Sequence, residues 1–156
     1  MQHTSEGRDD DGARFTPGVR HQSCVVKANR RVLLVLDVWG IDEDSFHSKY
    51  ELGYRMPSWG PEQQLNLGPD LKAWASVDAT RLAFRCDNLV ARDKGAAAVE
   101  ITVEGGIRTA DVKSASGQQA RLDIALKVAK KTAEWSLPCL NTVTFPDKPV
   151  AAALPF

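Results

Sequence analysis

The chain has 156 residues, of which 43% are hydrophobic and 26% charged, and its 20 basic residues balance 20 acidic ones. This length and composition are typical of one globular domain that is large enough to bury a core. A net charge of zero provides no long-range field to attract nucleic acid or an anionic membrane, so we expect no nucleic-acid partner. The sequence contains no run of 18 apolar residues, and it therefore predicts no transmembrane segment.

Polar or proline-rich segments mark both ends of the chain. Residues 1–20 show no apolar periodicity and are predicted to form a disordered N-terminal arm. Their polar composition does not match a secretory signal, which needs a basic region followed by an apolar stretch. Residues 145–156 contain three prolines and predict an extended C-terminal tail. A single α+β domain is predicted over residues 21–144.

The first strands are predicted from residues 24 to 56. Residues 32–39 are apolar at both alternating sets of positions, which is typical of a central strand. Residues 24–26 are expected to pair with it across the polar turn at residues 27–31. Residues 49–56 alternate between polar and apolar side chains and predict a half-buried antiparallel strand, with Tyr50 facing inward.

Two further alternating runs follow. Their inward-facing residues are expected to be Leu82, Phe84 and Cys86 in one run and Val99, Ile101 and Val103 in the next. Glu100 is expected to face solvent. The glycine pair at residues 105–106 predicts a tight hairpin that leads to a partner strand through Val112, because such turns need positive φ.

A long amphipathic helix is predicted near the C-terminus. Ser116 and Gln119 have the spacing of a capping box, which marks a helix start, and Pro138 ends the pattern after Trp135. The apolar stripe consists of Leu122, Ala125, Leu126, Ala129 and Ala133. The predicted fold class is therefore α+β, with a single, mostly antiparallel sheet of four to five strands and one long C-terminal helix packed on one face.

An acidic segment is the best candidate for a metal site. Its potential ligands are Asp37, Asp42, Asp44 and His47. Oxygen-rich loops suit hard cations, and one histidine shifts the preference toward a transition metal. The alternative interpretation is a solvated acidic loop.

Asp37 is the member of that segment that lies within an apolar strand. A buried carboxylate needs a partner, so we expect it to pair with an arginine. The candidate partners are Arg31, Arg81 and Arg85.

No catalytic motif occurs in the chain: nucleophile elbow, phosphate-binding glycine loop and zinc-protease helix are all absent. We therefore assign no catalytic residue and no cofactor. The first hypothesis is a non-catalytic domain that binds an unknown protein or small molecule. The second is a small metal-dependent hydrolase or metal-binding domain. The third is a cytosolic partner-binding subunit that exposes Trp39, Trp59 or Trp74.

The three cysteines are Cys24, Cys86 and Cys139, and any single disulfide leaves one of them unpaired. Cys86 ends a predicted strand, Cys139 follows the predicted helix, and Cys24 is the candidate for the odd thiol. The residues alone leave two alternatives open, a Cys86–Cys139 bond or buried free thiols. A bond indicates an oxidising compartment, whereas free thiols fit the cytoplasm.

The C-terminal half resembles small extracytoplasmic or membrane-anchored proteins of actinobacteria. The similar parts are residues 82–86 (Leu-Ala-Phe-Arg-Cys), 98–103 (Ala-Val-Glu-Ile-Thr-Val), the alanine-rich helix at 120–129 and 137–139 (Leu-Pro-Cys). They span less than half of the chain. The resemblance implies that Cys86 and Cys139 are bonded, that the location is extracytoplasmic, and that the protein has a non-enzymatic role at the outer surface.

Overall fold

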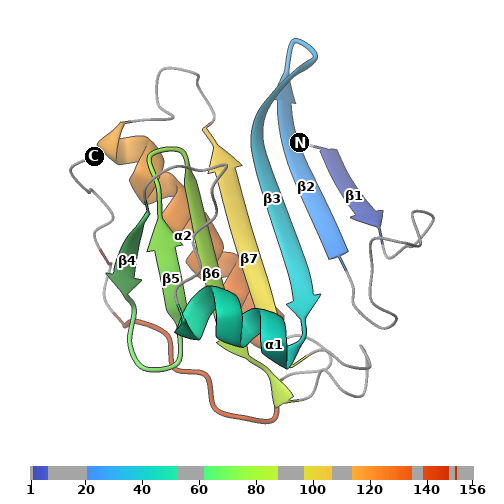
Figure 1. The fold of residues 1–156 in the computed structure, drawn as a ribbon. Helices are drawn as coiled ribbons and strands as arrows, with labels where there is room; N and C mark the ends of the chain where they lie inside the picture. The colour runs from blue at the N-terminus through green and yellow to red at the C-terminus, as the bar shows by residue number, and fades with distance from the viewer. Residues whose placement is uncertain are drawn as a thin grey trace.

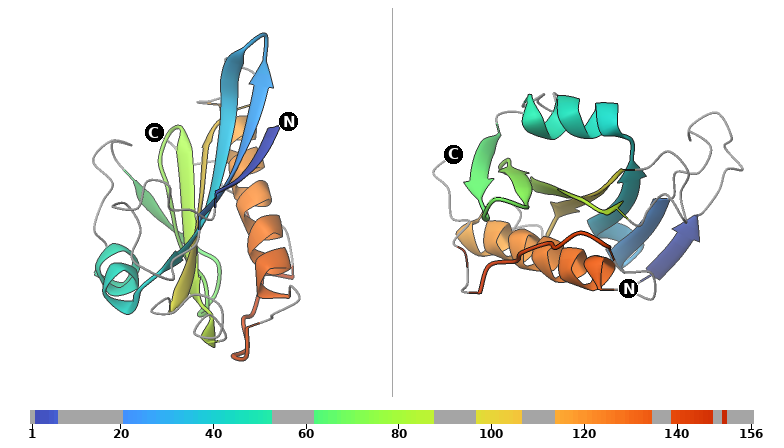
Figure 2. Two further views of the ribbon diagram at one scale, coloured as in Figure 1. Left: turned by 90° about the vertical axis from the view of Figure 1, so that its right-hand side faces the viewer. Right: turned by 90° about the horizontal axis from the view of Figure 1, so that it is seen from below.

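The computed structural model describes residues 2–6, 21–52, 62–87, 97–106, 114–134, 139–147 and 150. In these ranges one antiparallel sheet carries a long helix on one face and a short helical segment on the other (Figures 1 and 2). The strands, in spatial order, are β1 (Gln2–Glu6), β2 (His21–Ala28), β3 (Arg31–Ile41), β7 (Ala98–Gly105), β6 (Ala79–Arg85), β5 (Lys72–Ala75) and β4 (Gln63–Asn66). No helix in the described ranges is long and apolar enough to cross a membrane.

The α+β class and the C-terminal helix on one sheet face are confirmed, but the predicted number of strands is wrong. In the described part of the chain the sheet has seven strands instead of four to five. The additional strands are β1 at one edge and, on the opposite side of the sheet, β5 and the edge strand β4, which have four residues each. Edge strands this short carry too little alternation to be recognised from sequence.

β1 corrects the prediction that residues 1–20 form a disordered arm, at least for Gln2–Glu6. These five residues pair antiparallel with β2, from Gln2 opposite Val25 to Glu6 opposite His21. Their polar side chains conceal the strand in the sequence, because backbone pairing at a sheet edge does not require an apolar face. Residues 7–20 lie outside the described ranges.

The predicted pairing between the first two core strands is confirmed. β2 and β3 form an antiparallel hairpin that closes at Asn29 and Arg30. Both turn residues have positive φ, 52° and 65°, as a two-residue type I′ turn requires. β3 then lies between β2 and β7 in the interior of the sheet.

The predicted hairpin at Gly105–Gly106 is wrong. β7 pairs with β3 along one edge and with β6 along the other, over Ala98 to Glu104. A strand has only two edges, so none remains for the expected partner. Residues 107–113, which include Val112, lie outside the described ranges.

The predicted strand at residues 49–56 is also wrong where the structure describes it. α1 (Glu43–Phe46) continues into a π-helical turn, η2 (His47–Glu51). Asp42 caps the helix by accepting a 2.7 Å hydrogen bond from the Ser45 amide. Phe46 and Tyr50 are four residues apart, so they lie on one helical face, where both are buried and stack at 5.9 Å. Residues 53–56 lie outside the described ranges.

The main core lies between the sheet and α2 (Ala115–Ala133), which packs on β6 and β7 (Figure 2). The predicted inward residues of both strands are buried, as are most of the predicted helix stripe. Ala125 and Ala129 are fully buried, and their small side chains allow the helix close to the sheet. The helix start differs from prediction: the N-cap is Ser114, whose hydroxyl accepts from the Gly117 amide at 3.0 Å.

Residues 139–147 form no helix or strand, and Cys139, Val143 and Phe145 pack against the core that α2 covers. A disulfide joins Cys139 to Cys86 with a Cα–Cα distance of 4.8 Å. Phe145 packs edge-on against Phe84, with ring centroids 6.2 Å apart. Of the two alternatives left open by the sequence, the structure therefore has the Cys86–Cys139 bond. Cys24 is the free thiol, as predicted.

Candidate functional site

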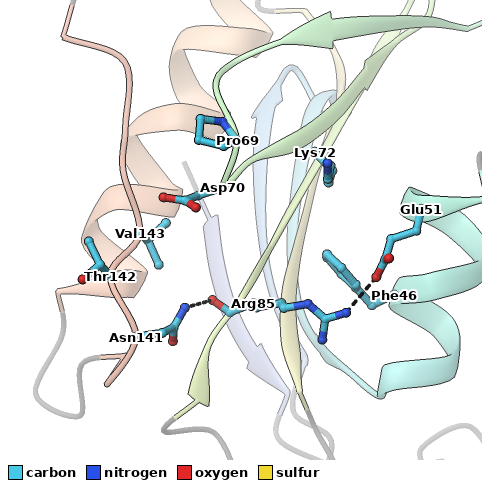
Figure 3. A pocket seen from close by; sticks show the side chains of 9 residues that line it. All are labelled: Phe46, Glu51, Pro69, Asp70, Lys72, Arg85, Asn141, Thr142 and Val143. Atoms are coloured by element: carbon cyan, nitrogen blue, oxygen red, sulfur yellow. Dashed lines mark hydrogen bonds and ion pairs between the residues drawn. The ribbon is translucent and has the colours of Figure 1, made fainter.

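A pocket of about 220 Å³ lies where α1 and η2 meet the ends of β5 and β6 and the C-terminal segment (Figure 3). Four separate parts of the chain supply its walls. The lining residues are Phe46, Glu51, Pro69, Asp70, Lys72, Arg85, Asn141, Thr142 and Val143. Charges of both signs therefore surround one small space.

Arg85 forms part of the lining and is firmly oriented. It is the last residue of β6, and its guanidinium lies over the Phe46 ring, 4.7 Å from the ring centroid. It donates to both carboxylate oxygens of Glu43 and, at 2.7 Å, to Glu51. The Glu43 hydrogen bond raises the pKa of Arg85, and the same bond lowers the pKa of Glu43. Two carboxylates thus neutralise this cation.

The wall formed by residues 141–143 is tied to β6 next to the disulfide. Cys86 directly follows Arg85, and its bond to Cys139 brings Asn141 beside the end of the strand. The Asn141 side chain donates to the Arg85 carbonyl at 3.0 Å and accepts from the Asp87 amide at 2.8 Å. One covalent bond and two hydrogen bonds therefore hold this wall in place.

Asp70 and Lys72 form the wall that comes from the β4–β5 connection. Asp70 accepts a 2.7 Å hydrogen bond from the Thr144 amide, which leaves most of its carboxylate lone pairs available. Lys72 begins β5, and no described residue forms a hydrogen bond or ion pair with its ammonium group. Arg85 is ion-paired with two carboxylates, whereas neither Asp70 nor Lys72 forms an ion pair with a described residue.

A buried polar network behind the pocket fastens η2 to the sheet. Arg81 donates to both oxygens of Glu62, at 2.8 and 3.0 Å, and to the Lys49 carbonyl at 3.1 Å. Tyr50 donates to Glu100 at 2.7 Å, and Lys49 lies 3.4 Å from the same carboxylate.

This network corrects the expectation that Glu100 faces solvent, since Glu100 is only 6% exposed. Burial raises the pKa of Tyr50 well above its ordinary value, and the charge of Glu100 raises it further. Burial lowers the pKa of Arg81, but the interactions with Glu62 and Tyr50 together outweigh burial and leave the pKa raised. All five groups have partners inside the protein, so we assign the network a structural role.

The predicted metal ligands are not brought together. Asp42 uses its carboxylate to cap α1, while Asp44 is exposed and His47 lies 3.7 Å from Glu51 on the surface. Asp37 lies on β3, in register with Ser23 and Thr102. The described part of the chain contains no group of three or more potential metal ligands.

Two of the three arginines that were candidate partners of Asp37 bind other carboxylates, Arg81 to Glu62 and Arg85 to Glu43 and Glu51. Trp39 and Trp74 are partly buried and pack against the residues beneath α1. Trp59 lies outside the described ranges.

Burial and the neighbouring charge of Asp37 raise the pKa of Cys24, which makes this thiol less reactive.

Sequence reasoning missed the pocket residues Glu51, Asp70, Lys72 and Arg85. They come from segments that are far apart in the chain, and their spacing forms no motif. The one signal near them was the pair Cys86 and Cys139, whose bonding the residues alone left open and only the resemblance of the C-terminal half implied.

No protein-family model matches the chain, and neither the curated proteins nor the solved structures contain a match. The site is therefore interpreted from its own geometry.

Proposed function

We propose that this protein is a non-catalytic ligand-binding domain that acts outside the cytoplasm and holds a small ligand in the pocket of Figure 3. The observation that carries the proposal is the cross-linked wall: the Cys86–Cys139 bond and the two Asn141 hydrogen bonds hold a separate segment against Arg85. Preorganised walls reduce the entropy that binding must otherwise remove.

Two features support binding over catalysis. Thr142 supplies a hydroxyl, but among the described residues no hydrogen bond joins that hydroxyl to a side chain that could activate it as a nucleophile. The charged lining also suits recognition, because a few placed polar groups orient a ligand in a small concave site. The alternative of a metal-dependent function has no comparable support, because its predicted ligands lie apart.

The extracytoplasmic location rests on the disulfide and on the resemblance of the C-terminal half. Disulfides persist in oxidising compartments and are rare in reducing ones. Alkylation of thiols in intact source cells, followed by mass spectrometry, tests the location. We expect only Cys24 to be modified; alkylation of all three cysteines would contradict it.

Binding is tested with a ligand-observed NMR screen of amino acids, organic acids, amines and sugars. The variant Thr142→Trp fills the pocket from an exposed position, and Lys130→Trp places the same side chain on the exposed side of α2. We expect at least one class of compound to bind the wild type and Lys130→Trp but not Thr142→Trp. The absence of any pocket-dependent binding would refute the proposal.

A further inference from the structure

The charges around the pocket differ in their availability to a ligand. Glu43 and Glu51 hold Arg85 through three hydrogen bonds, so its positive charge is already balanced. Lys72 has three donors and no hydrogen-bond or ion-pair partner among the described residues. Asp70 has one partner, the Thr144 amide. Lys72 and Asp70 are therefore the cation and the anion of the lining that no described ion pair occupies.

A ligand with a single charge suits this arrangement poorly. A simple anion that reaches Lys72 also meets the negative charge of Asp70, and a simple cation that reaches Asp70 meets Lys72. Charges at a few ångströms interact more strongly in a partly enclosed site than in water. A molecule with both charges is favoured at both ends, because electrostatic complementarity sets specificity.

The rest of the lining limits the size and chemistry of the ligand. Phe46, Pro69 and Val143 add apolar surface to the lining. The volume of about 220 Å³ is below the range of roughly 300–1,000 Å³ that drug-sized ligands occupy. The space therefore suits a molecule with the dimensions of a single aliphatic amino acid.

We infer that the ligand is a small aliphatic zwitterion of the α-amino-acid class, with its carboxylate at Lys72 and its ammonium at Asp70. This inference rests on the proposed binding function and specifies its ligand. The neutralised Arg85 then forms part of the wall and is not the primary anion partner.

Isothermal titration with chemically matched probes tests the two charges separately. The probes are valine, leucine, methionine and proline, each with its amide, which lacks the anion, and its N-acetyl form, which lacks the cation. We expect at least one free amino acid to bind about tenfold or more tightly than both of its derivatives, since each removed ion pair weakens affinity by roughly that factor.

Variants link the preference to the two side chains. Lys72→Met should remove the preference for the free acid over the amide. Asp70→Asn, which retains an acceptor for the Thr144 amide, should remove the preference for the free amine over the N-acetyl form. Lys130→Met makes the same change as Lys72→Met on the exposed side of α2 and should leave both preferences unchanged.

Two results would overturn the inference. The first is that, for each of the four amino acids, its amide or its N-acetyl form binds as tightly as the free amino acid. The second is that none of the four amino acids binds at concentrations up to 10 mM, which corresponds to a binding free energy of about 3 kcal/mol. If the wider screen still finds a pocket-dependent compound without opposite charges, only this inference fails. If that screen finds none, the proposed function fails with it.

Discussion

Arg81 and Glu62 show how one ion pair positions a helical segment. Both side chains are fully buried, and the guanidinium also lies over the rings of Tyr50 and Trp74. Two charges without solvent depend on each other, because either one alone is strongly unfavourable in the interior. The main effect of the Arg81–Glu62 pair on stability is therefore the large free-energy cost of removing one partner and leaving the other charge buried alone.

We predict that Glu62→Ala lowers the free energy of unfolding by about 3–5 kcal/mol, because it leaves Arg81 buried without its carboxylate. The matched control is Glu43→Ala, which removes an exposed partner of Arg85 and should cost at most about 1 kcal/mol. Urea denaturation measures both. Equal losses in the two variants would show that burial of the pair is not the decisive factor.

Tyr50 adds a pH dependence on the alkaline side. Burial, and then the charge of Glu100, hold the pKa of Tyr50 well above its ordinary value of 10.0, so the folded protein keeps the phenol protonated. The unfolded chain loses that proton first as the pH rises. The contribution of Tyr50 is therefore complete below the unfolded pKa and decreases as the pH rises from there toward the folded pKa.

Tyr50→Phe should consequently reduce the alkaline loss of stability. Above pH 10 we expect the wild type to lose up to about 1.4 kcal/mol per pH unit more than the variant. Below pH 9 the two curves should run parallel, with the variant lower by about 1.5–3 kcal/mol for the lost hydrogen bond to the Glu100 carboxylate. Urea midpoints across this range test the prediction, and parallel curves throughout would contradict it.

At the scale of elements, helix ends and strand edges decide where the pocket lies. The Asp42 cap begins α1 directly after β3, which places Phe46 and Glu51 beside the end of β6. The Ser114 cap begins α2, and its last turn precedes the segment that carries Cys139. Local hydrogen bonds therefore set the directions from which the pocket walls approach.

We predict that Ser114→Ala destabilises the protein by about 1 kcal/mol, the usual cost of removing an N-cap side chain. Ser116→Ala changes the residue that the sequence pattern favours as the cap, and it should cost less than half as much. Thermal unfolding of the two variants provides the comparison. A larger loss of stability in Ser116→Ala than in Ser114→Ala would support Ser116 as the N-cap and contradict the helix start at Ala115.

Across the whole molecule, the disulfide joins the two halves of the pocket. It links residues separated by 53 positions, one at the end of β6 and one beyond α2. In the chain-entropy interpretation a loop of this length stabilises the fold by about 4 kcal/mol. The same bond orients Asn141, so stability and pocket geometry depend on it together.

The double variant Cys86→Ser/Cys139→Ser should therefore lose about 4 kcal/mol of unfolding free energy and bind any pocket ligand more weakly. Cys24→Ser is the control, because Cys24 lies outside the bond and should change neither property. Denaturant unfolding and titration measure the two effects. A double variant within about 1 kcal/mol of the wild type would contradict the structural role of the bond.

Local patterns predicted the elements with strong periodicity. β3, β6, β7 and α2 carry regular apolar spacing, and each formed where it was expected, apart from the earlier start of α2. The predictions failed where signals were short or ambiguous. Residues 49–51 alternate like a strand, yet Phe46 and Tyr50 also have helical spacing, and packing against the sheet selected the helix.

The sequence by itself determined the α+β class, the amphipathic helix and the two cysteines near its boundaries, because these features depend on neighbouring residues. Only the tertiary structure decided that Glu100 is buried, that β7 has no free edge, and that Asp70, Lys72 and Arg85 surround one pocket. Such features depend on which distant segments meet. Strand pairing and packing across the whole sheet determine which distant segments come into contact, and the spacing of residues along the chain does not predict those contacts.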